Sequence, residues 1–289
     1  MSRTTRRTLL TAGTAGAATL LLSAPARAAT EPLRDLERRH GARLGVFAHD
    51  VRTRRTVTHR ADERFPVCSV FKTLAAAAVL RDLDRHGEVL SRRIHYTEAD
   101  LVDGSDHTRA HLSEGMTVAG LADVAIRYSD NTAGNLLLRE LGGPTAITRF
   151  ARSVGDPVTR LDRWETELNS AEPWRVTDTT SPRAIGRSYA RLVLGGALNR
   201  PDRALLTHWL LNNTTSARRF RAGLPADWTV ADKTGSGSYG TANDVGVAWT
   251  ATGGPVVLAV LTTKPDPEAA YDDALVAEAA ALVADALSR

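Results

Sequence analysis

Lysine is scarce in this sequence. Only three of its 37 basic residues are lysines, and all the others are arginines. An arginine side chain stays charged in proteins, whereas burial can push a lysine toward its neutral form. A chain that uses arginine for its surface charge has kept lysine for places where a guanidinium would not serve. Lys72, Lys233 and Lys264 are therefore the first candidates for chemistry.

Cysteine is scarcer still. Cys68 is the only cysteine in the 289 residues, so the chain has no internal disulfide. The fold must therefore rest on its hydrophobic core, which a chain of this length can bury. A lone cysteine in an apolar helix is usually a small buried residue rather than a nucleophile, and we interpret Cys68 in this way.

Long apolar runs are also missing, because no stretch reaches the roughly 20 residues that a membrane-spanning helix needs. Within the first 28 residues, Arg3, Arg6 and Arg7 precede an alanine- and leucine-rich run, and the A-x-A sequence Ala26–Ala28 follows it. This order is typical of an export signal, and the Arg6-Arg7 pair resembles a Tat signal. We therefore predict a secreted protein that is cleaved before Ala29 and has no stable membrane association afterwards.

Removal of residues 1–28 would bring the formal net charge of the chain to zero. The formal charge of the whole chain is +4, and residues 1–28 hold four arginines and no acid, so the mature chain is neutral. A neutral chain gives no argument for binding nucleic acid or an anionic membrane. The mature sequence shows no internal repeat, and we expect a monomer that acts on a small molecule.

The period of the hydrophobic pattern changes twice along the chain. Strand-like segments lie near both ends, at 43–50, 55–60, 227–235, 244–251 and 255–263. Helical periodicity marks 33–40, 69–86, 118–128, 132–141, 144–153, 181–194, 201–211 and 268–287. The order predicts an α/β (α+β) fold, in which a five-stranded antiparallel sheet from both termini is flanked by helices and carries an inserted all-α domain.

The same order predicts two domains in the mature chain. An α/β domain takes residues 29–60 and 212–289, and an all-α domain takes residues 61–211. The all-α domain contains a stretch, 160–180, with no clear periodicity. A structureless loop of that length inside a compact domain is usually functional.

The first chemical motif is Ser69-Val70-Phe71-Lys72. The i, i+3 spacing at the start of a predicted helix puts the hydroxyl and the amine on one face. A serine hydroxyl is a poor nucleophile until a base takes its proton. Desolvation among apolar neighbours lowers the pKa of a lysine, so Lys72 can serve as that base or as a proton relay.

Two tripeptides follow it along the chain. Ser129-Asp130-Asn131 lies between two predicted helices, and Lys233-Thr234-Gly235 lies at the end of a predicted strand. Alone, the first is typical of a helix cap and the second of a strand end with its turn glycine. Together, in this order and with two of the three lysines inside them, the three motifs match the set found in penicillin-interacting serine enzymes.

With these motifs, the mature chain resembles the class A serine β-lactamases over nearly its whole length. The loop at 160–180 contains Arg163-x-Glu165-x-x-Leu168-Asn169 and resembles the omega loop of that family, whose glutamate orients and deprotonates the hydrolytic water. Asp178 stands where the family has the aspartate that pairs with the loop arginine. The resemblance implies a hydrolase acting on cyclic amides, without cofactor or metal, whose substrates are penicillins, with cephalosporins as a further candidate.

The resemblance also implies roles for the catalytic residues. Ser69 attacks the β-lactam carbonyl, and the backbone N–H groups of Ser69 and Ser236 form the oxyanion hole. The proton leaves through Lys72, or through Glu165 by way of a water, and the sequence leaves this choice open. Ser129 passes a proton to the leaving nitrogen. Asn169 helps Glu165 to position the hydrolytic water.

The remaining implied residues bind substrate. Asn131 holds the side-chain amide of the substrate, and Lys233, Thr234, Gly235 and Ser236 form the segment that binds its carboxylate. Arg219 stands where some members of the family place an arginine that reaches the same carboxylate. Arg218 and Arg221 are close enough in sequence to remain alternatives.

Two positions depart from the family pattern. Gly104 stands where most relatives carry an aromatic residue at the site entrance, which removes a packing wall and leaves the substrate range open. Thr166 follows Glu165 where many relatives have proline. The peptide bond at this point tends to be cis in the family, and we predict a cis bond here although a non-proline cis bond costs about 3 kcal/mol.

Three other functions compete with this interpretation. His107 and His111 are four residues apart and could share a helix face in a zinc site, but the sequence has no clear third ligand nearby. A D-Ala-D-Ala carboxypeptidase shares the first three motifs and differs by the loop that carries Glu165. A β-lactam-binding protein that is acylated but does not turn over would share the motifs as well.

Overall fold

The computed structural model describes residues 30–288. The predicted export signal at 1–28 lies outside the described residues. Among residues 30–288, no helix is both long enough and apolar enough to span a bilayer.

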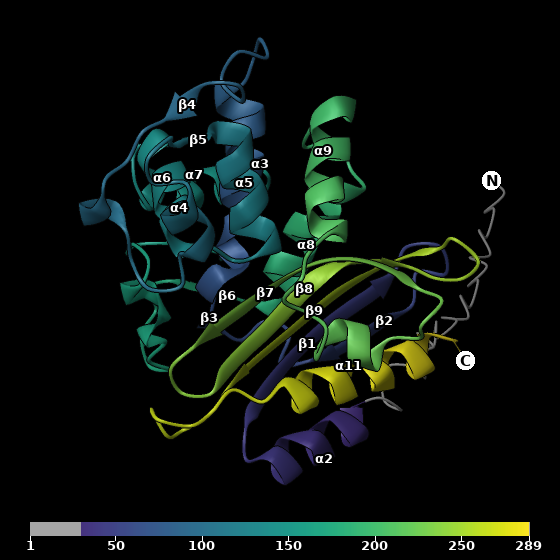
Figure 1. The fold of residues 1–289 in the computed structure, drawn as a ribbon. Coiled ribbons are helices and arrows are strands. Elements are labelled where there is room, and N and C mark those ends of the chain that lie inside the picture. Colours follow the sequence, from purple (N-terminus) through teal and green to yellow (C-terminus); the bar gives the residue numbers. More distant parts are fainter. Residues whose placement is uncertain (1–29, 289) are drawn as a thin grey trace, which may run out of the picture.

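A five-stranded antiparallel sheet forms the centre of the molecule, with strand order β2-β1-β9-β8-β7 (Figure 1). Its strands are β1 (Arg43–Asp50), β2 (Thr56–His59), β7 (Thr229–Gly237), β8 (Thr241–Trp249) and β9 (Pro255–Thr263). β1 pairs with β9 from Arg43 opposite Thr263 to Asp50 opposite Val256. The first and last strands of the chain, β1 and β9, therefore lie side by side in one sheet, and the predicted fold class is confirmed.

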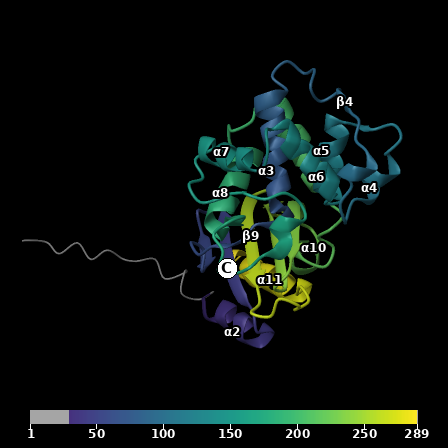
Figure 2. The same ribbon diagram turned by 90° about the vertical axis from the view of Figure 1, so that its left-hand side faces the viewer.

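One face of the sheet is covered by α2 (Thr30–His40) and α11 (Asp273–Ser288), which Figure 2 shows together below the sheet. Alternate residues of β1 point to this face, and Leu44 and Val46 are fully buried there with Leu275 of α11. Phe47 points to the opposite face and joins a second core. Burial on both faces explains why strands such as β9 are almost entirely apolar rather than alternating.

The opposite face is covered by α8 (Pro182–Val193) and by a block of further helices. Those are α3 (Phe71–Ala78), α4 (Asp106–Ala110), α5 (Val118–Arg127), α6 (Asn131–Glu140), α7 (Thr145–Ser153) and α9 (Arg200–Leu211). α8 approaches the sheet closely at Gly186, where an added Cβ would lie 2.8 Å from the ring of Phe47. The core of the block therefore continues onto the sheet through α8.

The shorter elements connect these layers. They are β3 (Phe65–Pro66) paired with β6 (Thr179–Thr180), β4 (Arg93–Ile94) paired with β5 (Met116–Thr117), α10 (Phe220–Gly223), and 3-10 turns at Cys68–Val70, Glu98–Asp100 and Glu167–Ser170. Apart from the turn at Cys68–Val70, which overlaps the helix predicted at 69–86, none of them was predicted, because such short segments carry too little hydrophobic pattern.

Most predicted helix bounds shift by one to three residues in the structure, and two helices depart further from the prediction. The helix predicted at 69–86 is a 3-10 turn, then α3, then a π-helical turn that ends at Leu83. It ends there because the carboxylate of Asp84 accepts hydrogen bonds from two backbone N–H groups farther along, at Val89 and Leu90. The helix predicted at 268–287 begins only at Asp273, since the backbone of Pro267 instead accepts from Tyr239.

Candidate active site

The motifs converge on a cavity of about 480 Å³ between the helical block and β7. Eight of the predicted site residues line it: Ser69, Ser129, Asn131, Asn169, Arg219, Thr234, Gly235 and Ser236. The other three, Lys72, Glu165 and Lys233, are buried behind the wall of the cavity. Residues that lie as much as 167 positions apart, such as Ser69 and Ser236, therefore share one site.

Ser69 lies in the 3-10 turn that precedes α3, rather than in the helix itself. The turn is reached through Cys68, whose φ of 45° is unusual for a residue other than glycine. β7 packs directly on this turn at Gly235, where an added Cβ would lie 3.2 Å from Cys68 and from the carbonyl of Val67. Gly235 thus lets the strand approach the serine closely.

Lys72 is fully buried and its amine is surrounded by oxygen atoms. Its Nζ donates to Ser69 Oγ at 2.9 Å, to the Ser129 carbonyl at 2.8 Å and to Asn131 Oδ1 at 2.6 Å. It also forms an ion pair with Glu165 Oε1 at 3.0 Å. An ammonium has three protons to donate, so Lys72 is held in one position by its neighbours.

Glu165 faces the serine directly. Ser69 Oγ donates to Glu165 Oε1 at 3.2 Å, and Asn169 Nδ2 donates to Glu165 Oε2 at 2.5 Å. The side chain of Glu165 is buried, with Lys72 as its counter-ion. The hydroxyl, the amine and the carboxylate therefore form one connected set of hydrogen bonds, in which Ser69 donates to the carboxylate and accepts from the amine.

The irregular loop at 160–180 is held in place by side chains. Arg163 Nε donates to Asp178 Oδ2 at 2.6 Å, and Asp178 Oδ1 accepts from the backbone N–H groups of Asp162 and Arg163. Leu168 is fully buried in the core. The peptide bond between Glu165 and Thr166 is cis, as predicted from the sequence.

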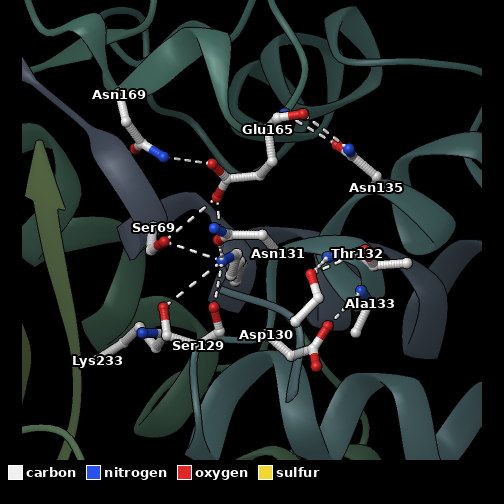
Figure 3. Close-up of polar contacts among 12 residues, drawn as sticks. Ser69, Ser129, Asp130, Asn131, Thr132, Ala133, Asn135, Glu165, Asn169 and Lys233 are labelled. Atoms are coloured by element: carbon white, nitrogen blue, oxygen red, sulfur yellow. Dashed lines mark hydrogen bonds and ion pairs between the residues drawn. The ribbon is translucent and has the colours of Figure 1, made fainter. Parts of the chain in front are cut away.

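Asn135 is a site residue that the sequence did not reveal. Its Oδ1 accepts from the N–H of Glu165 at 2.9 Å, and its Nδ2 donates to the C=O of Glu165 at 2.8 Å. One amide from α6 thus binds both backbone groups of the loop residue (Figure 3). Only the amide chemistry of asparagine could have suggested this, and nothing in its spacing does.

We expect Asn135→Ala to lower the free energy of unfolding by about 1–3 kcal/mol, because it leaves two backbone groups beside a buried carboxylate without partners. Thermal unfolding of the purified variant measures this. Asn212→Ala is the matched control, since that exposed amide bonds a carbonyl within its own helix, and its change should stay within about 0.5 kcal/mol. Equal melting temperatures for the two variants would contradict the role of Asn135.

In Ser129-Asp130-Asn131, the middle residue has the structural role. Asp130 Oδ1 accepts from the backbone of Ala133 at 2.8 Å, which caps α6, and its carboxylate also binds Thr108. The flanking residues are freed for the cavity, with Ser129 held at a φ of 63°. The helix-cap pattern seen in the sequence therefore belongs to Asp130, and Ser129 and Asn131 contact Lys72.

β7 supplies the opposite wall through Lys233 and Thr234. Lys233 is fully buried and donates to the Thr234 carbonyl at 2.9 Å. Burial holds the pKa of Lys233 well below its ordinary value and the charge of Lys72 lowers it further, whereas Asp244 and Asp232 oppose the shift. Thr234 Oγ1 lies 2.5 Å from Thr215 Oγ1, which also lines the cavity and was not predicted.

Of the three candidate arginines, Arg219 lies at the cavity. It is only 4% exposed, and its guanidinium donates to Ser236 Oγ at 2.6 Å and to Asp273 Oδ1 at 2.7 Å. Arg218 has a side chain that is 85% exposed, and Arg221 bonds Ser216 and backbone carbonyls instead. Of the three, the structure therefore places only Arg219 in the lining of the cavity.

Cys68, His107 and His111, the remaining candidates from the sequence, make structural contacts. Cys68 is fully buried, and burial raises the pKa of its thiol, which confirms its interpretation as a buried residue. His111 Nδ1 lies 2.9 Å from the His107 carbonyl, and the ring of His107 stacks on Tyr128. Within residues 30–288, no three His, Cys, Asp or Glu side chains are grouped to hold a metal ion.

Known proteins resemble this chain over nearly all its length. A family model described as "Beta-lactamase enzyme family" matches residues 28–287. The chain is 60% identical to a β-lactamase of Streptomyces fradiae, with 100% of each chain covered, and 59% identical to one of Streptomyces albus G, with 99% of this chain and 98% of the relative covered.

Solved structures give the same result. The structure of the Streptomyces albus G β-lactamase has a TM-score of 0.88 at 64% identity, covering 89% of this chain and 98% of the other. A β-lactamase from Desulfarculus baarsii has a TM-score of 0.89 at 48% identity, covering 91% of this chain and 98% of the other. The overall fold is thus shared with these two β-lactamases.

Proposed function

This chain belongs to the beta-lactamase enzyme family, and from that premise we propose that it is a class A enzyme, a hydrolase acting on cyclic amides that opens β-lactams through an acyl-enzyme on Ser69. The observation that carries the proposal is the contact of three groups. Ser69 Oγ lies 2.9 Å from Lys72 Nζ and 3.2 Å from Glu165 Oε1, and the last two atoms are 3.0 Å apart.

Acylation begins from these contacts. Ser69 Oγ bonds to the carbonyl carbon of the β-lactam and gives its proton to a base. A charged Lys72 has no lone pair to accept that proton, so Glu165 is then the acceptor, whereas a neutral Lys72 can accept it directly. The backbone N–H groups of Ser69 and Ser236 serve as the oxyanion hole in this proposal.

Breaking the ring transfers a proton to the leaving nitrogen. Ser129 is suited to this step because its Oγ lies 3.5 Å from Lys72 Nζ and lines the cavity. The carbon–nitrogen bond breaks as the nitrogen receives the proton of Ser129. Lys72 then donates a proton to Ser129. Hydrogen-bond donors for the carboxylate of the substrate come from three other residues that line the cavity, Thr234, Ser236 and Arg219.

Deacylation needs a base on the other side of the serine. Glu165 Oε2 and Asn169 Oδ1 belong to one hydrogen-bonded pair, and the Asn169 oxygen is a buried acceptor that no described residue satisfies. Together they offer two acceptors for the protons of a water that attacks the acyl carbonyl. This pair is what favours a hydrolase over a carboxypeptidase or a protein that is acylated without turnover.

A chromogenic cephalosporin tests the proposed function. We expect the purified mature chain to consume many equivalents of substrate per molecule, with steady turnover after mixing. A single burst equal to the protein concentration would show a β-lactam-binding protein instead. Release of D-alanine from a D-Ala-D-Ala peptide without cephalosporin turnover would favour the carboxypeptidase.

We also propose that the mature chain is secreted as a monomer. Support comes from the sequence pattern of residues 1–28, with the Tat-like Arg6-Arg7 pair, and from the absence of any sequence feature that indicates an oligomer. Cell fractionation tests export, and replacing both arginines with lysine should retain the precursor inside the cell if the Tat route is used.

A further inference from the structure

The entrance of the cavity lacks a side chain at Gly104. This residue lines the cavity with a φ of 71°, and its carbonyl accepts from the backbone N–H of Asn131 at 3.0 Å. An added Cβ would lie 2.9 Å from Asn131 Nδ2, so the loop is shaped for a residue without one. The rest of the lining is mostly hydroxyl, amide and charged groups, which leaves little apolar surface to hold a ring.

Tyr128 supplies an aromatic ring at this cavity. It is the last residue before Ser129, it lines the cavity, and 36% of it is exposed. Two side chains of the protein contact this ring. The ring of His107 lies 3.8 Å away, centroid to centroid, and Arg127 stands 5.0 Å from the ring centroid.

The ring of Tyr128 is also fixed at its polar end. Arg127 Nη2 donates to the Tyr128 hydroxyl at 3.2 Å, and Arg127 is itself held by Asp123 at 3.1 Å and by the carbonyl of Asn212. A ring that two partners already hold loses little freedom when a ligand packs on it, which favours binding. His107, which the sequence offered as a metal ligand, instead supports this ring.

We propose that Tyr128, held by contacts with His107 and Arg127, is the apolar wall of the substrate site and positions the ring that is fused to the β-lactam. The inference rests on the proposed function. The cavity neighbours of Tyr128 include Ser129, which serves the leaving nitrogen, and Thr215, which bonds Thr234 of the carboxylate-binding segment. Tyr128 therefore faces the half of a bicyclic substrate that carries the leaving nitrogen and the carboxylate.

The position gives a prediction about substrate class. A penicillin or cephalosporin has a second ring that can pack on Tyr128, whereas a monocyclic β-lactam has none. Tyr271 is the other tyrosine on the cavity, but it is 56% exposed, and Arg219 stands 5.9 Å from its ring centroid. Tyr128 is the more rigid of the two and is better suited to select between the classes.

Steady-state kinetics with benzylpenicillin and a monocyclic N-sulfonated β-lactam test the proposal. Tyr128→Ala should lower kcat/KM for benzylpenicillin about tenfold while kcat stays within about twofold, since aromatic packing of this kind is lost from binding. The monocyclic substrate should change by less than about twofold. Tyr128→Phe keeps the ring and should stay near the wild type with both substrates.

His107→Ala leaves Tyr128 in place and removes only its support, so it should give a smaller loss with the same preference for the bicyclic substrate. It also keeps the test open if Tyr128→Ala unfolds, which thermal unfolding would reveal. Suppose that the wild type is active. The inference is then overturned if Tyr128→Ala and His107→Ala keep full kcat/KM for benzylpenicillin, or if they lose kcat/KM equally for both substrates. An inactive wild type would instead overturn the proposed function.

Discussion

Glu165→Gln is expected to be acylated by a β-lactam and then to release product at least about a thousandfold more slowly than the wild type. Glutamine fills the same volume and keeps an oxygen for Lys72 or Asn169. It cannot accept a proton from the water that attacks the acyl carbonyl, so the reaction stops after the first step. Mass spectrometry of the intact protein should show one covalently bound equivalent, and the chromogenic assay should show a burst without turnover.

The same loop offers a matched control. Glu167 is exposed two residues farther along, so Glu167→Gln changes the same charge in the same segment and should keep turnover near that of the wild type. Thermal unfolding checks that both variants fold. Unchanged β-lactam turnover in Glu165→Gln would show that another group carries deacylation, and our assignment of the hydrolytic base would be wrong.

Lys72→Arg is expected to slow acylation about a thousandfold. Arginine keeps the positive charge beside Glu165 but cannot lose its proton in a protein, so it cannot act as a base or return a proton to Ser129. The site also has no room for a guanidinium, since an added Cβ at Gly134 would already lie 2.9 Å from Lys72 Cε. Stopped-flow measurement of the acylation rate gives the result directly.

Lys264→Arg serves as the control for this exchange. Lys264 pairs with Asp272 at 3.1 Å outside the cavity, and its side chain is 20% exposed. An arginine can make the same ion pair, so acylation should not change. A Lys72→Arg variant that acylates at the wild-type rate would show that Glu165 suffices as the acylation base, and the choice between the two bases would be decided against the lysine.

The sequence predicted the convergence of Ser69 and Lys72 by local geometry, because three positions on a helical turn bring two side chains together. Glu165 lies 96 positions from Ser69, and no local period links them. Its place followed only from the resemblance of the loop to a known family. The structure adds the physical reason, which is that Asp178, Leu168 and Asn135 fix the irregular loop at three points.

The residues that were not predicted share one property. Asn135 acts through two hydrogen bonds to another residue's backbone, and Thr215 and Asp273 reach the cavity from segments with no motif of their own. Partners of this kind depend on how distant elements pack, which hydrophobic periodicity does not describe. Strand bounds shifted by up to three residues for a similar reason, since pairing across the sheet decides where a strand ends.

The pairing of β1 with β9 also decides when this protein becomes active. Residues 43 and 263 are partners although 220 positions separate them, and contacts between such distant segments make folding slow. β7, which supplies Thr234 and Ser236, is held in the sheet through β8 and β9. A growing chain therefore has no completed catalytic centre before β9 has been synthesised, and the polypeptide is inert up to that point.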